Sequence, residues 1–168
     1  MVVTIRRAVP GDGTQLCQVH KTSIVELCGG HYTREQIAVW ADPRHQEEYE
    51  RAIGSVPTFV AEHGSTIVGF AMADWNHRLI LAVYVHPDYA GVGVGRKLVR
   101  KLEAEAGSAG VTELWLNATL NSVPFYERCG YASRGSAKNT LPNGAELPCV
   151  RMAKRLTAEP AGSQLDQH

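Results

Sequence analysis

The chain has no surplus of either charge. Its 168 residues contain 17 basic and 17 acidic side chains, so the formal net charge is zero. A protein that neutralises nucleic-acid phosphates usually carries a basic surplus, and we therefore expect no nucleic-acid partner. Apolar stretches are far shorter than a membrane span, and no hydrophobic signal segment opens the chain, so we expect no membrane partner either.

Cysteine is also sparse, and its spacing is uninformative for a metal site. Cys17, Cys28, Cys129 and Cys149 are scattered, and no C-x-x-C pair occurs. This pattern favours reduced, mostly buried thiols in a cytoplasmic protein over a disulfide framework or a metal centre. We expect no metal ligands and a cytoplasmic location.

The composition is that of an ordinary globular domain, with 44% apolar and 20% charged residues. A chain of this length can bury an adequate core in one domain. We expect a single domain over residues 1–156. Residues 157–168 lack apolar periodicity, which predicts a disordered tail.

A glycine-rich loop follows an apolar, β-branched stretch that ends before Pro87. Gly91, Gly93 and Gly95 form the loop, and an amphipathic helix begins directly after it. Glycines let a ligand approach the backbone, and a helix N-terminus offers free N–H groups with partial positive charge, so the pattern favours a phosphate ligand. The loop lacks the spacing of a Walker loop and of a dinucleotide fingerprint. A loop with no ligand is the remaining alternative.

The segment YVHPDYAGVGVGRKL resembles the central motif of the GNAT superfamily of acyl-CoA-dependent N-acetyltransferases. The resemblance implies acetyl-CoA as co-substrate, with the main chain of Val83, Tyr84 and Val85 beside its acetyl and pantetheine parts. It also implies a pyrophosphate loop made by Ala90, Gly91, Val92, Gly93, Val94, Gly95 and Arg96. Ala90 stands where the family usually has Gln or Arg, so we expect weaker anchoring of the phosphates.

A second segment, Phe125-Tyr-Glu-Arg-Cys-Gly-Tyr131, is similar to the FYEKxGF signature of the same family. The resemblance implies that Tyr126 protonates the departing thiolate; the alternative is a packing aromatic. The family often has asparagine seven residues before this tyrosine, where this chain has Thr119. Asn117 and Asn121 flank it, and any of the three could contact the cofactor arm.

The hydrophobic pattern predicts the element order β-α-α-β-β-β-α-β-α-β-β. The expected strands cover 2–9, 57–62, 66–75, 78–85, 112–116, 131–136 and 147–156, and the expected helices 14–28, 34–40, 93–109 and one around Tyr126. A further helix over 45–53 is plausible, and Thr33 with Gln36 forms a possible capping box. The resemblance implies an α/β (α+β) GNAT fold: a mixed, mostly antiparallel sheet with helices on both faces and splayed central strands.

The general base is left open by the sequence. The strand position that carries a glutamate in some relatives falls near Leu79, which cannot take a proton. Glu26, at the end of the first helix, is one candidate; Asp74, His77 and Tyr84 are others, and a chain of waters is equally credible.

The acceptor side is expected over residues 24–40. His31, Tyr32 and Trp40 are the candidate substrate-binding residues. The alternative is that Tyr32 and Trp40 only pack a helix onto the sheet.

The predicted function is transfer of an acetyl group from acetyl-CoA to a primary amine, directly in a ternary complex. The acceptor is a small-molecule amine or a protein amino group. The alternative is a non-catalytic acyl-CoA-binding or sensing module with the same fold. Nothing near Cys129 lowers its pKa, which argues against an acyl-cysteine intermediate. A homodimer through a terminal strand edge is possible.

Overall fold

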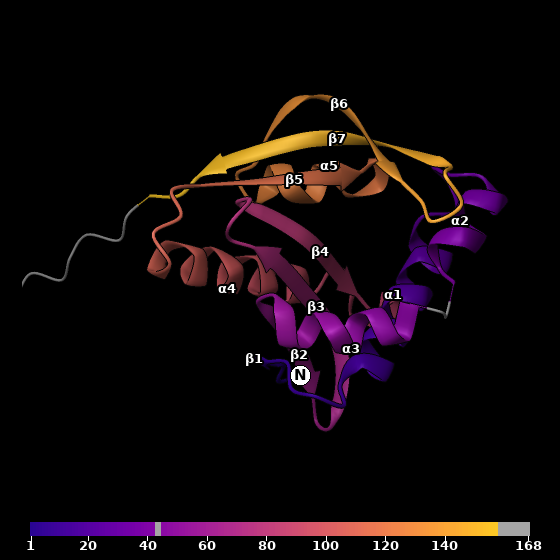
Figure 1. Cartoon of the computed structure of the whole chain (residues 1–168). Coiled ribbons are helices and arrows are strands. Elements are labelled where there is room, and N and C mark those ends of the chain that lie inside the picture. Colours follow the sequence, from indigo (N-terminus) through magenta and orange to yellow (C-terminus); the bar gives the residue numbers. More distant parts are fainter. Residues whose placement is uncertain (43–44, 158–168) are drawn as a thin grey trace, which may run out of the picture.

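The computed structural model describes residues 1–42 and 45–157, which form one seven-stranded sheet in the order β1-β2-β3-β4-β5-β7-β6 (Figure 1). All neighbouring strands are antiparallel except β4 and β5. The strands are β1 (Thr4–Arg7), β2 (Thr58–His63), β3 (Thr66–Asp74), β4 (Leu79–Val85), β5 (Glu113–Thr119), β6 (Ala132–Thr140) and β7 (Glu146–Arg155). The helices are α1 (Gly13–Leu27), α2 (Arg34–Trp40), α3 (Gln46–Ser55), α4 (Val94–Ser108) and α5 (Val123–Arg128), with short 3₁₀ turns η2 (Pro87–Tyr89) and η3 (Leu120–Ser122).

Helices cover both faces of the sheet, as predicted. In β3, Ala71 and Ala73 pack into the cluster that contains Leu98 and Leu102 of α4, whereas Phe70 packs with α1 and α3 on the other face. This division follows from the two-residue period of a strand, which sends alternate side chains to opposite faces. Within the described part of the chain, no helix has both the length and the apolar character needed to cross a bilayer.

The predicted elements are present, with shifted ends. The capping box of α2 is confirmed: the Thr33 hydroxyl accepts from Gln36 N–H at 3.1 Å, and the Gln36 side chain accepts from Thr33 N–H at 2.9 Å. The further helix expected over residues 45–53 is also present, as α3. Strand β5 runs past its predicted end at Leu116 because it stays paired with β7 as far as Thr119. The predicted tail, apart from residue 157, lies outside the described residues.

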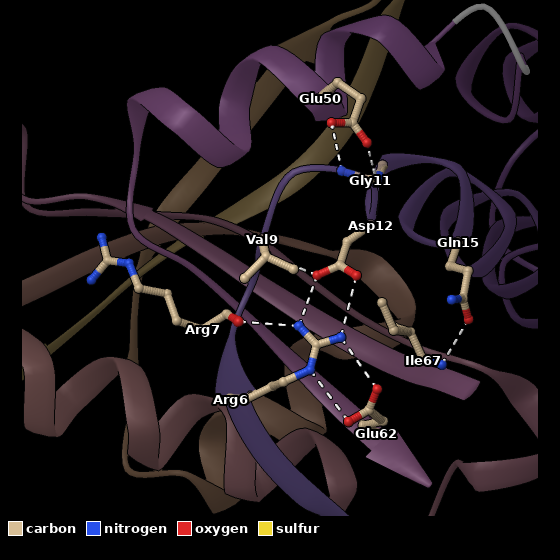
Figure 2. Close-up of polar contacts among 10 residues, drawn as sticks. Arg6, Arg7, Val9, Gly11, Asp12, Gln15, Glu50, Glu62 and Ile67 are labelled. Atoms are coloured by element: carbon tan, nitrogen blue, oxygen red, sulfur yellow. Dashed lines mark hydrogen bonds and ion pairs between the residues drawn. The ribbon is translucent and has the colours of Figure 1, made fainter. Parts of the chain in front are cut away.

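A partly buried ionic network fixes the connection between β1 and α1 (Figure 2). The Arg6 guanidinium donates to both carboxylate oxygens of Asp12, at 2.8 and 3.2 Å, and to Glu62 at 3.2 and 3.3 Å. Asp12 also accepts from Val9 N–H at 2.9 Å, and Glu50 of α3 accepts from Gly13 N–H at 2.6 Å. The network anchors the N-terminal end of α1, whose opposite end reaches the cavity described below.

Candidate active site

The two parallel strands at the centre of the sheet separate soon after they meet. Among the described residues, Leu79 and Trp115 are their only register pair, supported by a 2.8 Å bond from Trp115 N–H to the Arg78 carbonyl. Beyond this point β4 follows β3 and β5 follows β7, so the strands diverge (Figure 1). A cavity of about 800 Å³ is lined by residues of both strands.

The open edge of β4 presents unpaired peptide groups to this cavity. His86 N–H donates to the Val68 carbonyl at 2.8 Å, and the ladder then places Val85 opposite Gly69 and Val83 opposite Ala71 without a register shift. In an antiparallel ladder, alternate residues direct both peptide groups to the partner strand. Since His86 bonds to β3, the peptide groups of Val83 and Val85 point away from β3, toward the cavity.

The glycine loop lies at the end of β4 and leads into α4. Gly91 and Gly93 have φ values of +76° and +92°, which favour glycine. The first intrahelical bond of α4 joins Lys97 N–H to the Gly93 carbonyl, so the preceding N–H groups of the first turn have no acceptor within the helix. A Cβ on Gly95 would lie 3.1 Å from Cζ of Phe125, so glycine there lets α4 approach α5 closely. The loop thus combines free N–H donors with a helix N-terminus, an arrangement that can bind an anionic group.

Tyr126 of α5 lines the cavity. The residue is 7% exposed, its ring packs edge-on against Tyr131, and burial raises the pKa of its hydroxyl well above the ordinary value. The phenol therefore remains protonated at neutral pH. Cys129 also lines the cavity, and burial raises the pKa of its thiol, which disfavours the reactive thiolate form.

The wall of the cavity formed by Trp40 and Tyr84 is backed by a cluster of aromatic side chains that the sequence did not predict. Trp40 Nε1 donates to the Tyr84 hydroxyl at 3.2 Å, and the buried His20 ring stacks on Tyr84 at 4.8 Å. His20 Nε2 bonds to the Trp40 carbonyl at 2.8 Å, and its Nδ1 bonds to the Tyr49 hydroxyl. Burial lowers the pKa of His20 to about 4, so the ring is neutral, donating to Trp40 and accepting from Tyr49.

Most of the predicted site residues line the cavity. They are Trp40, Val83, Tyr84, Val85, Ala90, Gly91, Gly93, Gly95, Arg96, Asn117, Asn121 and Tyr126. Leu27 of α1, Cys28 directly after it, and Asn139 and Leu147 of the β6–β7 hairpin also line it. The sequence did not predict the hairpin residues, because they reach the site only through the long-range pairing of β7 with β5.

Five predicted residues have side chains that do not line the cavity. Glu26 is exposed, because Ser23 and Leu27, one helical turn apart, face the cavity and Glu26 lies on another side of α1. His31 is exposed as well. Val92 is 58% exposed and Val94 is buried in the core beneath α4, but both were predicted to offer main-chain N–H groups, and that stays a prediction.

Tyr32 is the fifth, and its hydroxyl group holds distant segments of the chain together. Its hydroxyl donates to the Pro148 carbonyl at 2.7 Å and accepts from Leu120 N–H at 3.0 Å. It therefore joins the loop between α1 and α2 to η3 and to β7, and it does not line the cavity.

The other base candidates are not at the site either, apart from Tyr84. His77 Nδ1 lies 2.7 Å from Asp74 Oδ2 in the connection between β3 and β4, at the paired end of the wedge. Within the described ranges, no three His, Cys, Asp or Glu side chains gather so that they could hold a metal ion.

Comparison with known proteins identifies the family. Residues 26–131 match the profile of the "Acetyltransferase (GNAT) family". The chain is 27% identical over 129 residues to the uncharacterized N-acetyltransferase YafP of Escherichia coli, covering 77% of this chain and 81% of YafP. It is 30% identical over 121 residues to the L-amino acid N-acyltransferase MnaT of the same organism, covering 64% and 65%.

Solved structures have the same fold. A GCN5-related N-acetyltransferase from Rhodopseudomonas palustris, described as "Aminotransferase, Class-II", superposes with a TM-score of 0.85 at 29% identity, covering 93% of this chain and 99% of that one. The PaiA N-acetyltransferase of Thermoplasma acidophilum, in complex with coenzyme A, superposes with a TM-score of 0.71 at 21% identity, covering 92% and 99%. The chain therefore belongs to the GNAT acetyltransferase family and is an acetyltransferase.

Proposed function

We propose that the protein transfers an acetyl group from acetyl-CoA to a primary amine, directly within a ternary complex. The observation that carries the proposal is the wedge between β4 and β5, which opens from a single register pair at Leu79 and Trp115. One edge of the wedge offers free peptide groups, its open end leads to the glycine loop, and Tyr126 lines it.

The loop and the open strand edge account for binding of the co-substrate. The diphosphate fits at the N–H groups of the first turn of α4, with Arg96 and Arg128 as the cations that line the same cavity. The pantetheine arm fits along β4, where Val83 and Val85 offer peptide groups in place of a neighbouring strand. Thr119 and Asn121, which line the cavity just before α5, are further polar partners for the arm.

The chemistry requires polarisation of the thioester carbonyl and a proton for the leaving sulfur. The Val83 N–H, directed into the wedge, can donate to the carbonyl oxygen as negative charge develops on it. Tyr126 keeps its proton at neutral pH because burial raises its pKa, so it can donate that proton to the thiolate as the C–S bond breaks.

The test is release of coenzyme A thiol from acetyl-CoA in the presence of a panel of amines. Tyr126→Phe should lower kcat by about 100-fold or more, as expected for loss of a general acid, with the Kd for acetyl-CoA unchanged. Tyr131→Phe is the matched control: it removes the same atom from the ring packed against Tyr126, outside the cavity, and should leave kcat unchanged.

Tight binding of acetyl-CoA without turnover on any amine would instead favour a non-catalytic sensing module. Equal activity of both variants would remove Tyr126 from the mechanism. A homodimer through the edge strand β6 and a cytoplasmic location remain predictions from the sequence.

A further inference from the structure

The described side chains that line the cavity include none that could take a proton from an ammonium ion. None of them is Asp, Glu, His or Lys, and the charged ones are Arg96 and Arg128. Arg96 lies in the first turn of α4 and Arg128 is the last residue of α5. Burial raises the pKa of the remaining titratable groups that line it, Tyr84, Tyr126 and the thiols of Cys28 and Cys129, so they stay protonated and neutral.

The half of the cavity on the α1 and α2 side is uncharged, as far as the described residues go, and largely apolar. Strand alternation places the Tyr84 ring on this side, since Val83 and Val85 pack toward the α4 core while Tyr84 packs with the clusters of α1 and α2. Leu27, Trp40, Leu141 and Leu147 complete the apolar surface, and Ser23 and Thr140 add hydroxyl groups. A charged group placed here would lose its hydration without gaining a counter-charge.

We infer that the acceptor is an uncharged, weakly basic primary amine on a mainly apolar group. The inference rests on the proposed acetyl transfer and names its substrate class.

Proton balance explains why a neutral amine suits this cavity. The amine nitrogen forms the C–N bond, the C–S bond breaks, and the Tyr126 phenol gives its proton to sulfur. The nitrogen then loses one proton, which restores the phenol directly or through a water molecule, so no proton leaves the site. An ammonium substrate carries one proton more, and none of the described lining side chains can accept it.

The same features disfavour two common classes of amine. A polyamine would bring several positive charges into a cavity whose charged side chains, among the described residues, are the two arginines. A free amino acid would bring a carboxylate to the α1 and α2 side, where no described lining residue offers a cation to pair with it. An amino-acid amide, whose amine is less basic and which has no carboxylate, satisfies both conditions.

A matched set of amines tests the inference with the unmodified enzyme and acetyl-CoA. The probes are L-phenylalaninamide, 2-phenylethylamine, L-phenylalanine and spermidine. At pH 7 we expect kcat/KM to be at least about tenfold higher for L-phenylalaninamide than for 2-phenylethylamine, and about 100-fold higher than for the other two, because a larger share of the amide is neutral and unpaired charges are excluded. For 2-phenylethylamine, kcat/KM should rise about tenfold per pH unit up to the pKa of the amine itself, since no enzyme base titrates.

The outcomes separate the two proposals. Acetylation of spermidine or L-phenylalanine in preference to the amide would overturn the inference and leave the acetyltransferase function intact. Binding of acetyl-CoA without turnover on any probe or other amine would overturn both proposals.

Discussion

Two glycines of the same helix give a matched test of how closely α4 approaches α5. A Cβ built on Gly95 lies 3.1 and 3.2 Å from two ring carbons of Phe125, whereas a Cβ on Gly107 meets no atom within 4 Å. Replacing a helical glycine by alanine gains roughly 0.5–1 kcal/mol of stability. Overpacking a well-filled site costs roughly 1–3 kcal/mol.

The two terms give opposite signs for the two substitutions. Gly107→Ala should stabilise the protein by about 0.5–1 kcal/mol in urea unfolding. Gly95→Ala should be destabilising or at best neutral, by about 0–2 kcal/mol, because overpacking offsets the helical gain. Gly95→Ala should also weaken acetyl-CoA binding measured by calorimetry, since Phe125 precedes Tyr126 and both line the cavity.

Equal stabilisation by both substitutions, with acetyl-CoA binding unchanged, would refute this reasoning. It would mean that α4 and α5 do not touch at Gly95, and that the glycine there only reflects the loop before it. A reduced affinity with unchanged stability would still support close approach of the ligand to the backbone at this point.

Three further predictions concern the supports of the site. Burial lowers the pKa of His20 from its ordinary value of 6.5 to about 4 in the folded protein. Its contribution to stability is therefore complete above pH 6.5 and is lost as the pH falls toward 4. In urea unfolding measured from pH 7 to 4, His20→Gln should remove about 3 kcal/mol of this loss of stability in acid. Arg6 holds the pKa of Asp12 below its usual range. Asp12→Asn should therefore lower the free energy of unfolding by about 1–3 kcal/mol at pH 7, and this difference from the parent protein should shrink as Asp12 protonates in acid. A difference that does not depend on pH would contradict this. Tyr32→Phe should cost about 1–3 kcal/mol of stability and leave kcat/KM unchanged, because it removes the hydroxyl that bonds to the Pro148 carbonyl and the Leu120 N–H. A loss confined to kcat/KM would instead place Tyr32 at the substrate.

The sequence predicted the parts of the site that depend on local pattern. An apolar strand, a run of glycines and an amphipathic helix follow one another along the chain, so the loop at Gly91–Gly95 and its place before α4 could be predicted, while phosphate binding there stays a prediction. The divergence of β4 from β5 was predicted only through the resemblance to a family, because strand pairing is a long-range property.

The acceptor side could be predicted only in part. Trp40 lines the cavity as expected, but Glu26 does not, since a shift of one position on a helix turns a side chain by about 100°. His20 lies in the middle of a helix pattern and looks like any core residue in the sequence. Its stacking on Tyr84 depends on how α1 crosses β4, which no local pattern specifies.

The separation of β4 and β5 leaves the centre of the sheet without a continuous ladder. Their single register pair means that β1–β4 and β5–β7 are joined there by few backbone bonds. A ligand that bonds to the Val83 and Val85 peptide groups would act as a temporary strand and tie these two halves together. Acetyl-CoA should then raise the melting temperature with its concentration and slow hydrogen exchange at those two amides, so that the enzyme is at its most rigid when it is ready to react.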